Sequence, residues 1–348
     1  MLNNFLDFLL LFKYPLIVLF SLFFFLTVYW KNIFSYFHLK PYKSIQRIHI
    51  DEVPRLGGLC IFIFLVFLGY DELSKNHLFT SLLIGSIPIV LIGFKEDIFH
   101  NTSPGIRLVF MVASCLIFFN IYSFDFPVID IPYIGKIISI YPISIIFFIF
   151  STLVVINGMN LIDGINGLFG LTALCQLLAL YVLCSYVGEY EFNKIILALI
   201  IPLIIFLLFN FPLGKLFAGD LGAYLYGFLI SMLTITFFGK HQNLISWLAV
   251  LILIYPCNEL LFSYLRKFYS NVNPLEADNL HLHSLIYKKI SKKRNNTLEV
   301  NFICIGILSL LWLMPLLAII FNKTILSVSI FLCLFMLAYI FFYSLFKE

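Results

Sequence analysis

The chain has 348 residues, of which 62% are hydrophobic, 18% aromatic and only 11% charged. A soluble domain has roughly 45–50% apolar and about 25% charged residues, so this composition excludes a soluble enzyme. The net charge of +4 is too small a surplus to attract nucleic acid, and no nucleic-acid partner is expected.

Apolar runs separated by charges and by Pro, Gly and Asn clusters predict an all-α, polytopic integral membrane protein, because a bilayer core takes about 20 apolar residues per helix. We expect about eleven spans, near residues 5–29, 56–70, 78–94, 106–124, 137–157, 168–187, 194–211, 218–238, 243–265, 300–320 and 324–345. The sequence has no internal repeat and no low-complexity linker. Residues 1–348 are therefore predicted to form a single membrane domain.

An odd number of spans divides the loops into two sets whose Lys and Arg content can be compared. Most of the 22 basic residues fall in the loops at 30–55, 94–107, 157–167, 210–219 and 266–299 and at the C-terminus. The other set holds only Lys13, Lys75, Lys136, Lys194, Lys240 and Lys323. This asymmetry predicts that the first set is cytoplasmic, with the N-terminus outside and the C-terminus in the cytoplasm.

Conspicuous polar residues gather in the loops predicted to be cytoplasmic. The first group is DEVPRLGG at 51–58, which a turn leading into a helix, with a snorkelling Arg55, explains equally well. The second group is GFKED at 93–97, followed by SPGIR at 103–107. Two carboxylates at the end of an apolar helix are costly unless paired or hydrated, and a solvated helix end is the alternative. Adjacent helix positions point about 100° apart, so Glu96 and Asp97 cannot share one task.

The segment NGMNLIDGINGLFG at 157–170 is the most informative stretch of the chain. Polar residues recur at every third position, as Asn157, Asn160, Asp163 and Asn166, and glycines follow the same spacing. A helical turn would align the polar side chains in one stripe, while the glycines bring a neighbouring backbone close. Carboxylate and amide oxygens at this spacing suit a hard cation or a hydroxylated ligand. A stripe of hydrogen bonds between helices is the alternative.

The segment NFPLGKLFAGDLG at 210–222 places Asp220 between glycines at the start of a span, with Asn210 and Lys215 nearby. A carboxylate is favoured at a helix N-terminus by the helix dipole, so capping alone would explain Asp220. The gathering of polar residues beside it favours a site instead.

The longest predicted cytoplasmic loop contains DNLHLH at 278–283. Side chains two positions apart face opposite sides of a helix, so one ligand held by both His281 and His283 requires an irregular loop. Two loop histidines exposed to water are the alternative. The basic run KKISKKR at 288–294 is expected to anchor the chain to lipid headgroups.

Together these groups place carboxylates, carboxamides, histidines and cationic side chains at one membrane face. Oxygen ligands without a thiolate indicate Mg²⁺, with Mn²⁺ as the alternative, and both metals commonly bridge phosphates. Basic residues beside a metal indicate a phosphate substrate. Their position at the membrane boundary predicts one lipid substrate, which enters sideways, and one soluble phosphate ester.

The groups resemble motifs of the polyprenyl-phosphate N-acetylhexosamine-1-phosphate transferases of glycosyltransferase family 4. The resemblance covers most of the chain and rests on PRLGG at 54–58, GFKED with SPGIR at 93–107, NGMNLIDGINGL at 157–168, NFPLGKLFAGDLG at 210–222 and HLH at 281–283. It implies transfer of a sugar 1-phosphate from a UDP-N-acetylhexosamine to undecaprenyl phosphate, with Mg²⁺ and release of UMP. The place implied is the cytoplasmic face of a bacterial inner membrane, where the product starts a lipid-linked cell-envelope glycan such as lipopolysaccharide.

The resemblance also implies roles for individual residues. The metal ligands implied are Asp220 and, close to the same metal, Asn160. The catalytic set implied is Asp97, which deprotonates or positions the lipid phosphate, with Glu96 beside it, and Asp163, which contacts the diphosphate or the metal network. The substrate contacts implied are Asn210 on the nucleotide side, His281 and His283 near the sugar nucleotide, and Arg107 and Arg55 on phosphate.

The sequence departs from the family pattern at three positions. The family commonly has two aspartates where this chain has Glu96 and Asp97, and an aspartate where it has Asn166, which we leave out of the catalytic set. Leu282 separates two histidines that are adjacent in the peptidoglycan branch, so the simple-hexosamine branch is favoured over a phospho-MurNAc-pentapeptide transferase. Two rival functions are a secondary transporter and a degenerate relative kept for assembly. The donor sugar and a homodimeric state are left open.

Overall fold

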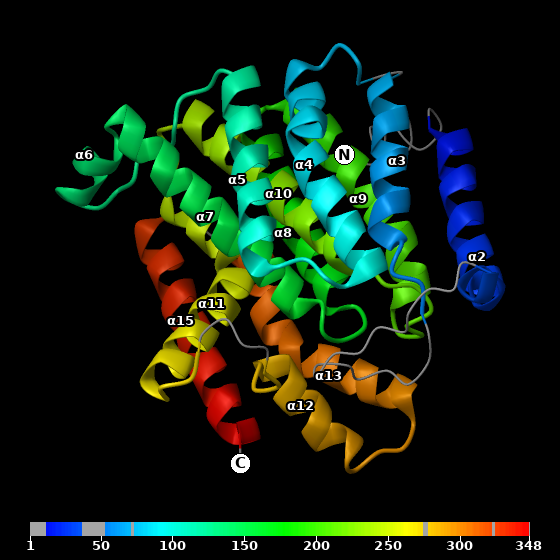
Figure 1. Ribbon diagram of the computed structural model, residues 1–348. Coiled ribbons are helices and arrows are strands. Elements are labelled where there is room, and N and C mark those ends of the chain that lie inside the picture. Colours follow the sequence, from blue (N-terminus) through cyan, green and yellow to red (C-terminus); the bar gives the residue numbers. More distant parts are fainter. Residues whose placement is uncertain (1–11, 37–52, 71–72, 274–277, 322–323, 348) are drawn as a thin grey trace.

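The computed structural model describes residues 12–36, 53–70, 73–273, 278–321 and 324–347, and every regular element in these ranges is a helix. With the labels of Figure 1, these are α2 (Lys13–Tyr36), α3 (Gly57–Tyr70), α4 (His77–Phe99), α5 (Pro104–Ile121), α6 (Ile134–Ile138), α7 (Tyr141–Ile162), α8 (Leu168–Val187), α9 (Tyr190–Asn210), α10 (Gly219–Lys240), α11 (Trp247–Tyr269), α12 (Leu282–Ser291), α13 (Thr297–Trp312), α14 (Met314–Phe321) and α15 (Ile325–Lys347). The predicted all-α class is confirmed.

The helices match the predicted apolar runs. Among the described residues, nine helices are long and apolar enough to cross a membrane, and α13 and α14 form a further pair bent by 44°. The described part of the chain is thus that of a multi-pass membrane protein. α3 is apolar but short, as its run at 56–70 suggested. The count of eleven spans and the orientation stay predictions, and the start of the first run, at 5–11, lies outside the described residues.

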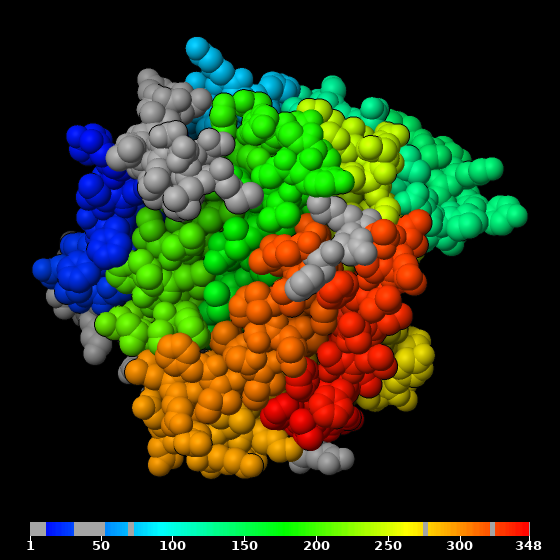
Figure 2. Space-filling model, turned by 180° about the vertical axis from the view of Figure 1, so that it is seen from behind, coloured from blue at the N-terminus to red at the C-terminus, as the bar shows by residue number. Residues whose placement is uncertain are grey.

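Helix α10 forms the centre of the bundle. Its sequence is apolar on all sides, which predicts a helix without a water-facing stripe. The residues of its apolar window are all buried, and it packs against α3, α4, α7 and α8 (Figure 1). The surface seen in Figure 2 is instead formed by outer helices, with α13 and α15 in contact at the lower end. The residues at the two ends of α10 are therefore positioned by the helices that pack around it.

Glycines bring α3 and α4 unusually close to the first turn of α10. A Cβ atom on Gly58 would lie 2.3 Å from the backbone N of Gly222, and one on Gly93 would lie 2.5 Å from Cα of Leu221. The facing atoms are backbone and cannot move aside. Glycine in the 54–58 and 93–97 motifs therefore serves the approach of three chain segments to one point.

We expect Gly58→Ala to lower the free energy of unfolding by about 3 kcal/mol, because the new methyl group overlaps the backbone of α10. The matched control is Gly306→Ala in α13, where no atom lies within 4 Å of the new Cβ. The thermal midpoint of the detergent-solubilised protein should fall for the first variant and stay level or rise for the second. Equal midpoints would contradict the close packing of α3 on α10.

Candidate active site

Three of the predicted site residues meet at the N-terminus of α10. Arg55, just before α3, places Nε 3.2 Å from Oδ1 of Asp97 and Nη2 2.8 Å from Oδ1 of Asp220. Asp97 lies in the last turn of α4, and Asp220 is the second residue of α10. One guanidinium therefore joins two carboxylates that are 123 positions apart in the sequence.

The backbone around Arg55 is fixed to the segment that precedes α10. The N–H groups of Gly57 and Gly58 donate to the carbonyls of Phe217 and Ala218, at 3.1 and 2.9 Å, and the Phe217 N–H donates to the Pro54 carbonyl at 2.9 Å. The PRLGG and NFPLGKLFAGDLG motifs thus run side by side as paired backbone. This pairing holds the Arg55 side chain against the carboxylates.

Asp97 caps α10 from a neighbouring helix. Its Oδ1 accepts a hydrogen bond from the Asp220 N–H at 2.8 Å, and its Oδ2 accepts one from the Leu221 N–H at 3.0 Å. These N–H groups belong to the first turn, where a helix has no internal acceptors and favours a negative charge. Gly219, at φ +74°, admits the carboxylate, because a Cβ there would lie 2.4 Å from Oδ2 of Asp97. Its catalytic role stays a prediction, and the contacts described are positioning contacts.

Asp220 is held through both carboxylate oxygens. Oδ1 accepts from Nδ2 of Asn160 at 3.2 Å in addition to Arg55, and Oδ2 accepts from the Tyr224 hydroxyl at 3.1 Å. Arg107 lies on the far side of that hydroxyl, with Nη1 3.2 Å from the phenolic oxygen and 3.6 Å from Oδ2 of Asp220. Asn160 and Arg107 thus join the cluster as the sequence predicted. Tyr224 was missed, although its position one helical turn after Asp220 signals the contact.

Asp163 completes the group of three aspartates. It lies in the turn after α7, and its carboxylate accepts no hydrogen bond from any residue that the structure describes. Burial raises the pKa of the Asp163 carboxyl to about 8, the Arg55 guanidinium opposes this shift, and the charges of Asp220 and Asp97 add to it. Burial therefore disfavours the charged form of Asp163, and a cation beside this carboxylate would favour it.

The donor set fits Mg²⁺ if water or phosphate oxygens complete the coordination shell. Across the described ranges, no three His, Cys, Asp or Glu side chains converge on a point where they could hold a metal ion. Mg²⁺, however, is usually bound by one or two protein carboxylates together with water and phosphate oxygens. Asp220, the unpaired carboxylate of Asp163 and the amide oxygen of Asn160 are oxygen ligands of this kind.

Glu96 lies apart from these contacts. Its carboxylate accepts a hydrogen bond from the Thr102 N–H at 2.9 Å and so closes the loop between α4 and α5. This loop turns at His100, which has φ +51°. Neighbouring helix positions point in different directions, as the sequence predicted, and here one faces α10 while the other faces its own loop. A catalytic role for Glu96 stays a prediction.

The segment at 157–170 is not one helical stripe. α7 ends at Ile162 and α8 begins at Leu168, so the expected stripe is wrong beyond α7. The intervening turn passes through Gly167 at φ +87°, where a Cβ would lie 2.5 Å from the Phe211 ring. The break in the helix is what lets Asp163 and Asn160 face the same cluster from a turn and a helix end.

Asn210 joins this turn to the segment before α10. Its Oδ1 accepts from the Gly167 N–H at 2.7 Å, and its Nδ2 donates to the Leu216 carbonyl at 2.8 Å. The side chain is 4% exposed. The predicted nucleotide contact is untested, and the observed bonds show a side chain that shapes two loops of the site.

His281 and His283 are buried, which excludes the alternative of two solvent-exposed loop histidines, and their predicted role in substrate binding stays a prediction. Their rings stack with centroids 5.6 Å apart and planes 9° from parallel. The two rings can stack because His281 has extended backbone, at φ −71° and ψ 145°, whereas His283 already lies in the first turn of α12. A Cβ on Gly164 would lie 2.3 Å from Nε2 of His283, so this ring contacts the turn that carries Asp163. Burial lowers the pKa of His283 to about 4, and the imidazole is neutral at pH 7.

Glu259 is a second residue that sequence reasoning missed. It lies within α11, is 1% exposed, and its Oε1 is 3.2 Å from Nδ1 of His281 and accepts from the Leu282 N–H at 3.1 Å. Its Oε2 accepts from the Tyr339 hydroxyl at 2.9 Å. A carboxylate inside an apolar span was the available signal. Glu259 fixes the start of α12 and the orientation of the first histidine.

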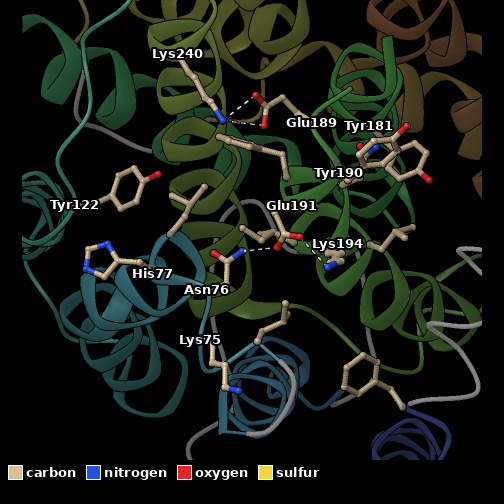
Figure 3. A pocket seen from close by; sticks show the side chains of 17 residues that line it. Lys75, Asn76, His77, Tyr122, Tyr181, Glu189, Tyr190, Glu191, Lys194 and Lys240 are labelled. Atoms are coloured by element: carbon tan, nitrogen blue, oxygen red, sulfur yellow. Dashed lines mark hydrogen bonds and ion pairs between the residues drawn. The ribbon is translucent and has the colours of Figure 1, made fainter. Parts of the chain in front are cut away.

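A cavity of about 850 Å³ lies at the opposite end of the bundle (Figure 3). It is lined by residues before and at the start of α4, at the start of α9 and at the end of α10. Its charges are paired in part, with Lys194 2.8 Å from Glu191 and Lys240 2.8 Å from Glu189. α4 and α10 each extend about 30 Å between this cavity and the aspartates, so the two sites are separate.

Known proteins match the chain over the same residues. The sequence model of glycosyl transferase family 4 matches residues 79–238, a range that includes Asp97, Asp163 and Asp220. This part of the chain is thus similar to glycosyl transferase family 4. The curated relatives are named as sugar-phosphate transferases, and this similarity favours an enzyme over a secondary transporter.

Several curated relatives carry specific names. The chain is 25% identical to the "Probable undecaprenyl-phosphate N-acetylglucosaminyl 1-phosphate transferase" of Bacillus subtilis, over 69% of this chain and 67% of the relative. It is 27% identical to the undecaprenyl-phosphate alpha-N-acetylglucosaminyl 1-phosphate transferase of Thermotoga maritima, over 74% and 76%. It is 24% identical to the phospho-N-acetylmuramoyl-pentapeptide-transferase of Streptococcus thermophilus, over 58% and 66%. Both the simple-hexosamine branch and the peptidoglycan branch are thus represented.

Proposed function

We propose that this protein transfers an N-acetylhexosamine 1-phosphate from a UDP-sugar to a polyprenyl phosphate such as undecaprenyl phosphate, with release of UMP. The observation that carries the proposal is the meeting of Arg55, Asp97, Asn160, Arg107 and Asp220 at one end of α10. These residues come from four separate motifs, and an arrangement of oxygen donors beside two guanidinium groups suits a diphosphate with a divalent cation.

Asp220 and Asn160 would hold a Mg²⁺ ion, with Asp163 beside them. The chemistry that such an ion would supply is positive charge to offset the charge that develops on the diphosphate. Arg107 and Arg55 face the same space and would bind phosphate oxygens, for which the planar guanidinium is well suited. Asp97 holds the first turn of α10, and with it Asp220, in a fixed place.

The chemical step requires little proton transfer. The second pKa of a phosphate monoester is about 6, so the lipid phosphate is already largely ionised at pH 7 and can attack the β-phosphorus directly. Positioning of the two substrates then supplies most of the rate. Both oxygens of Asp97 accept hydrogen bonds, which supports one-step attack over a phospho-aspartate intermediate. Trapping of a phosphorylated Asp97 would overturn the one-step route.

The site is proposed to face the cytoplasm of a bacterial inner membrane. The support is the excess of Lys and Arg in the loops that carry the aspartates and histidines, together with the bacterial relatives. The product would then begin a lipid-linked glycan of the cell envelope. Leu282, which separates the two histidines, supports a simple hexosamine as the donor.

A donor panel tests the proposal. Purified protein with undecaprenyl phosphate and Mg²⁺ is expected to release UMP from UDP-GlcNAc or another simple UDP-N-acetylhexosamine, and release should stop when EDTA removes the metal. UDP-MurNAc-pentapeptide in the same panel distinguishes the peptidoglycan branch. Uptake of a substrate into vesicles without any UMP release would overturn the proposal in favour of a carrier.

A further inference from the structure

Tyr224 occupies an unusual place between two charged groups of the site. It lies one turn after Asp220 on α10 and is 1% exposed. Its hydroxyl contacts Oδ2 of Asp220 at 3.1 Å and Nη1 of Arg107 at 3.2 Å. A phenol thus separates a carboxylate from a guanidinium that would otherwise attract each other directly.

The directions of these hydrogen bonds are fixed by chemistry. A guanidinium can only donate, so the phenolic oxygen accepts from Arg107. The single phenolic proton is then free to go to Oδ2 of Asp220. Tyr224 therefore links Arg107 to Asp220 through two hydrogen bonds, in place of a direct hydrogen bond between the two charged side chains.

The distances show that Arg107 and Asp220 form an ion pair without a direct hydrogen bond. Nη1 of Arg107 is 3.6 Å from Oδ2 of Asp220, beyond the 2.7–3.2 Å of an ordinary N–H···O bond. Arginine and carboxylate form strong two-point pairs when nothing intervenes. Such a pair would occupy Oδ2 and the guanidinium together, and both are groups that the proposed reaction needs.

We infer that Tyr224 is a positioning residue that prevents a direct hydrogen bond between Asp220 and Arg107, so that Oδ2 stays available to a divalent cation and the guanidinium stays available to a phosphate oxygen. This rests on the proposed function for the identity of the cation and the phosphate. The hydroxyl itself, and not the bulk of the aromatic ring, performs this role. Phenylalanine would fill the same volume and leave the gap open to Arg107.

Tyr226 provides a matched control in the same helix. It is fully buried, and its hydroxyl donates to the Leu199 carbonyl at 2.9 Å, in α9. Tyr226→Phe therefore removes one buried hydrogen bond of α10 without touching the aspartates. Any change shared by the two variants reports stability alone.

The direct test is Mn²⁺ binding to the full-length protein in detergent, followed by electron paramagnetic resonance in the absence of substrates. Tyr224→Phe is expected to weaken Mn²⁺ binding about tenfold, as loss of an outer hydrogen bond to a metal ligand commonly does, while Tyr226→Phe keeps the wild-type affinity. Thermal midpoints are recorded for both variants. Equal Mn²⁺ affinity in the two Tyr→Phe variants, or no Mn²⁺ binding by the wild type, would overturn the inference.

A second pair of variants tests the spacing role itself. If Arg107 bonds directly to Asp220 in the Tyr224→Phe variant, the double variant Tyr224→Phe with Arg107→Gln should regain most of the lost Mn²⁺ affinity. The single variant Arg107→Gln, in which Tyr224 is unchanged, should bind Mn²⁺ at least as tightly as the wild type does. Additive losses of Mn²⁺ affinity in the double variant, or weaker Mn²⁺ binding by Arg107→Gln alone, would overturn the inference. Wild-type Mn²⁺ binding and this rescue, without UMP release from any donor, would support the inference and defeat only the proposed function.

Discussion

Asp220→Asn should reduce the initial rate of UMP release about a thousandfold, the range seen when one electrostatic group of an active site is removed. Asparagine keeps the size of the side chain but removes the negative charge that faces Arg55 and Arg107. The oxygen that remains is a poor ligand for Mg²⁺ compared with a carboxylate. The rate is measured with saturating donor and polyprenyl phosphate.

The control for this variant is Asp125→Asn. Asp125 is exposed, and its backbone carbonyl lies beside Gly239 at the other end of α10. This variant removes the same charge from the same protein, so its rate should match the wild type. A rate for Asp220→Asn within tenfold of this control would show that Asp220 is not a ligand of the catalytic cation.

Arg55→Gln is expected to have the second large effect, because it affects both folding and transfer. It leaves Asp97, Asp163 and Asp220 close together without the guanidinium that pairs with two of them. Removing one partner of a buried pair costs 3–5 kcal/mol, and since the Arg55 side chain is 20% exposed we expect about 2–3 kcal/mol. The thermal midpoint should fall, and UMP release should drop at least about a hundredfold.

Magnesium separates the two effects of this variant. Added Mg²⁺ should raise the thermal midpoint of Arg55→Gln more than that of the wild type, because a cation beside the aspartates offsets part of the lost charge. Lys215→Gln is the control, since Lys215 is exposed on the neighbouring loop. A midpoint for Arg55→Gln that matches this control would contradict the role of the ion pairs in holding α3, α4 and α10 together.

Much of the fold could be predicted because apolar length is a local property. The ends of the helices were less predictable. The apolar run at 78–94 ends before Lys95, whereas α4 continues to Phe99. The helix extends because Asp97 is not solvated at its end but bonded to α10. A local pattern cannot contain that information, since the partner lies more than a hundred residues away.

The candidate site could be predicted where its residues are polar or charged within apolar sequence. Arg55, Asp97, Asn160 and Asp220 stood out as polar groups in apolar surroundings, and they meet. Tyr224 and Glu259 were missed, because a tyrosine in an apolar helix is ordinary and Glu259, although a carboxylate in an apolar span, has no partner nearby in sequence. Burial of the two histidines depends on Glu259 and on the start of α12, which only the folded chain brings together.

The cap that Asp97 places on α10 limits how the protein can admit two large substrates. Because its carboxylate is fastened to the Asp220 and Leu221 amides, the last turn of α4 and the first turn of α10 form one rigid block. Any movement that admits a lipid tail or a nucleotide is then expected in other segments, such as the turn at 163–167 or the histidine segment that contacts this turn at Gly164.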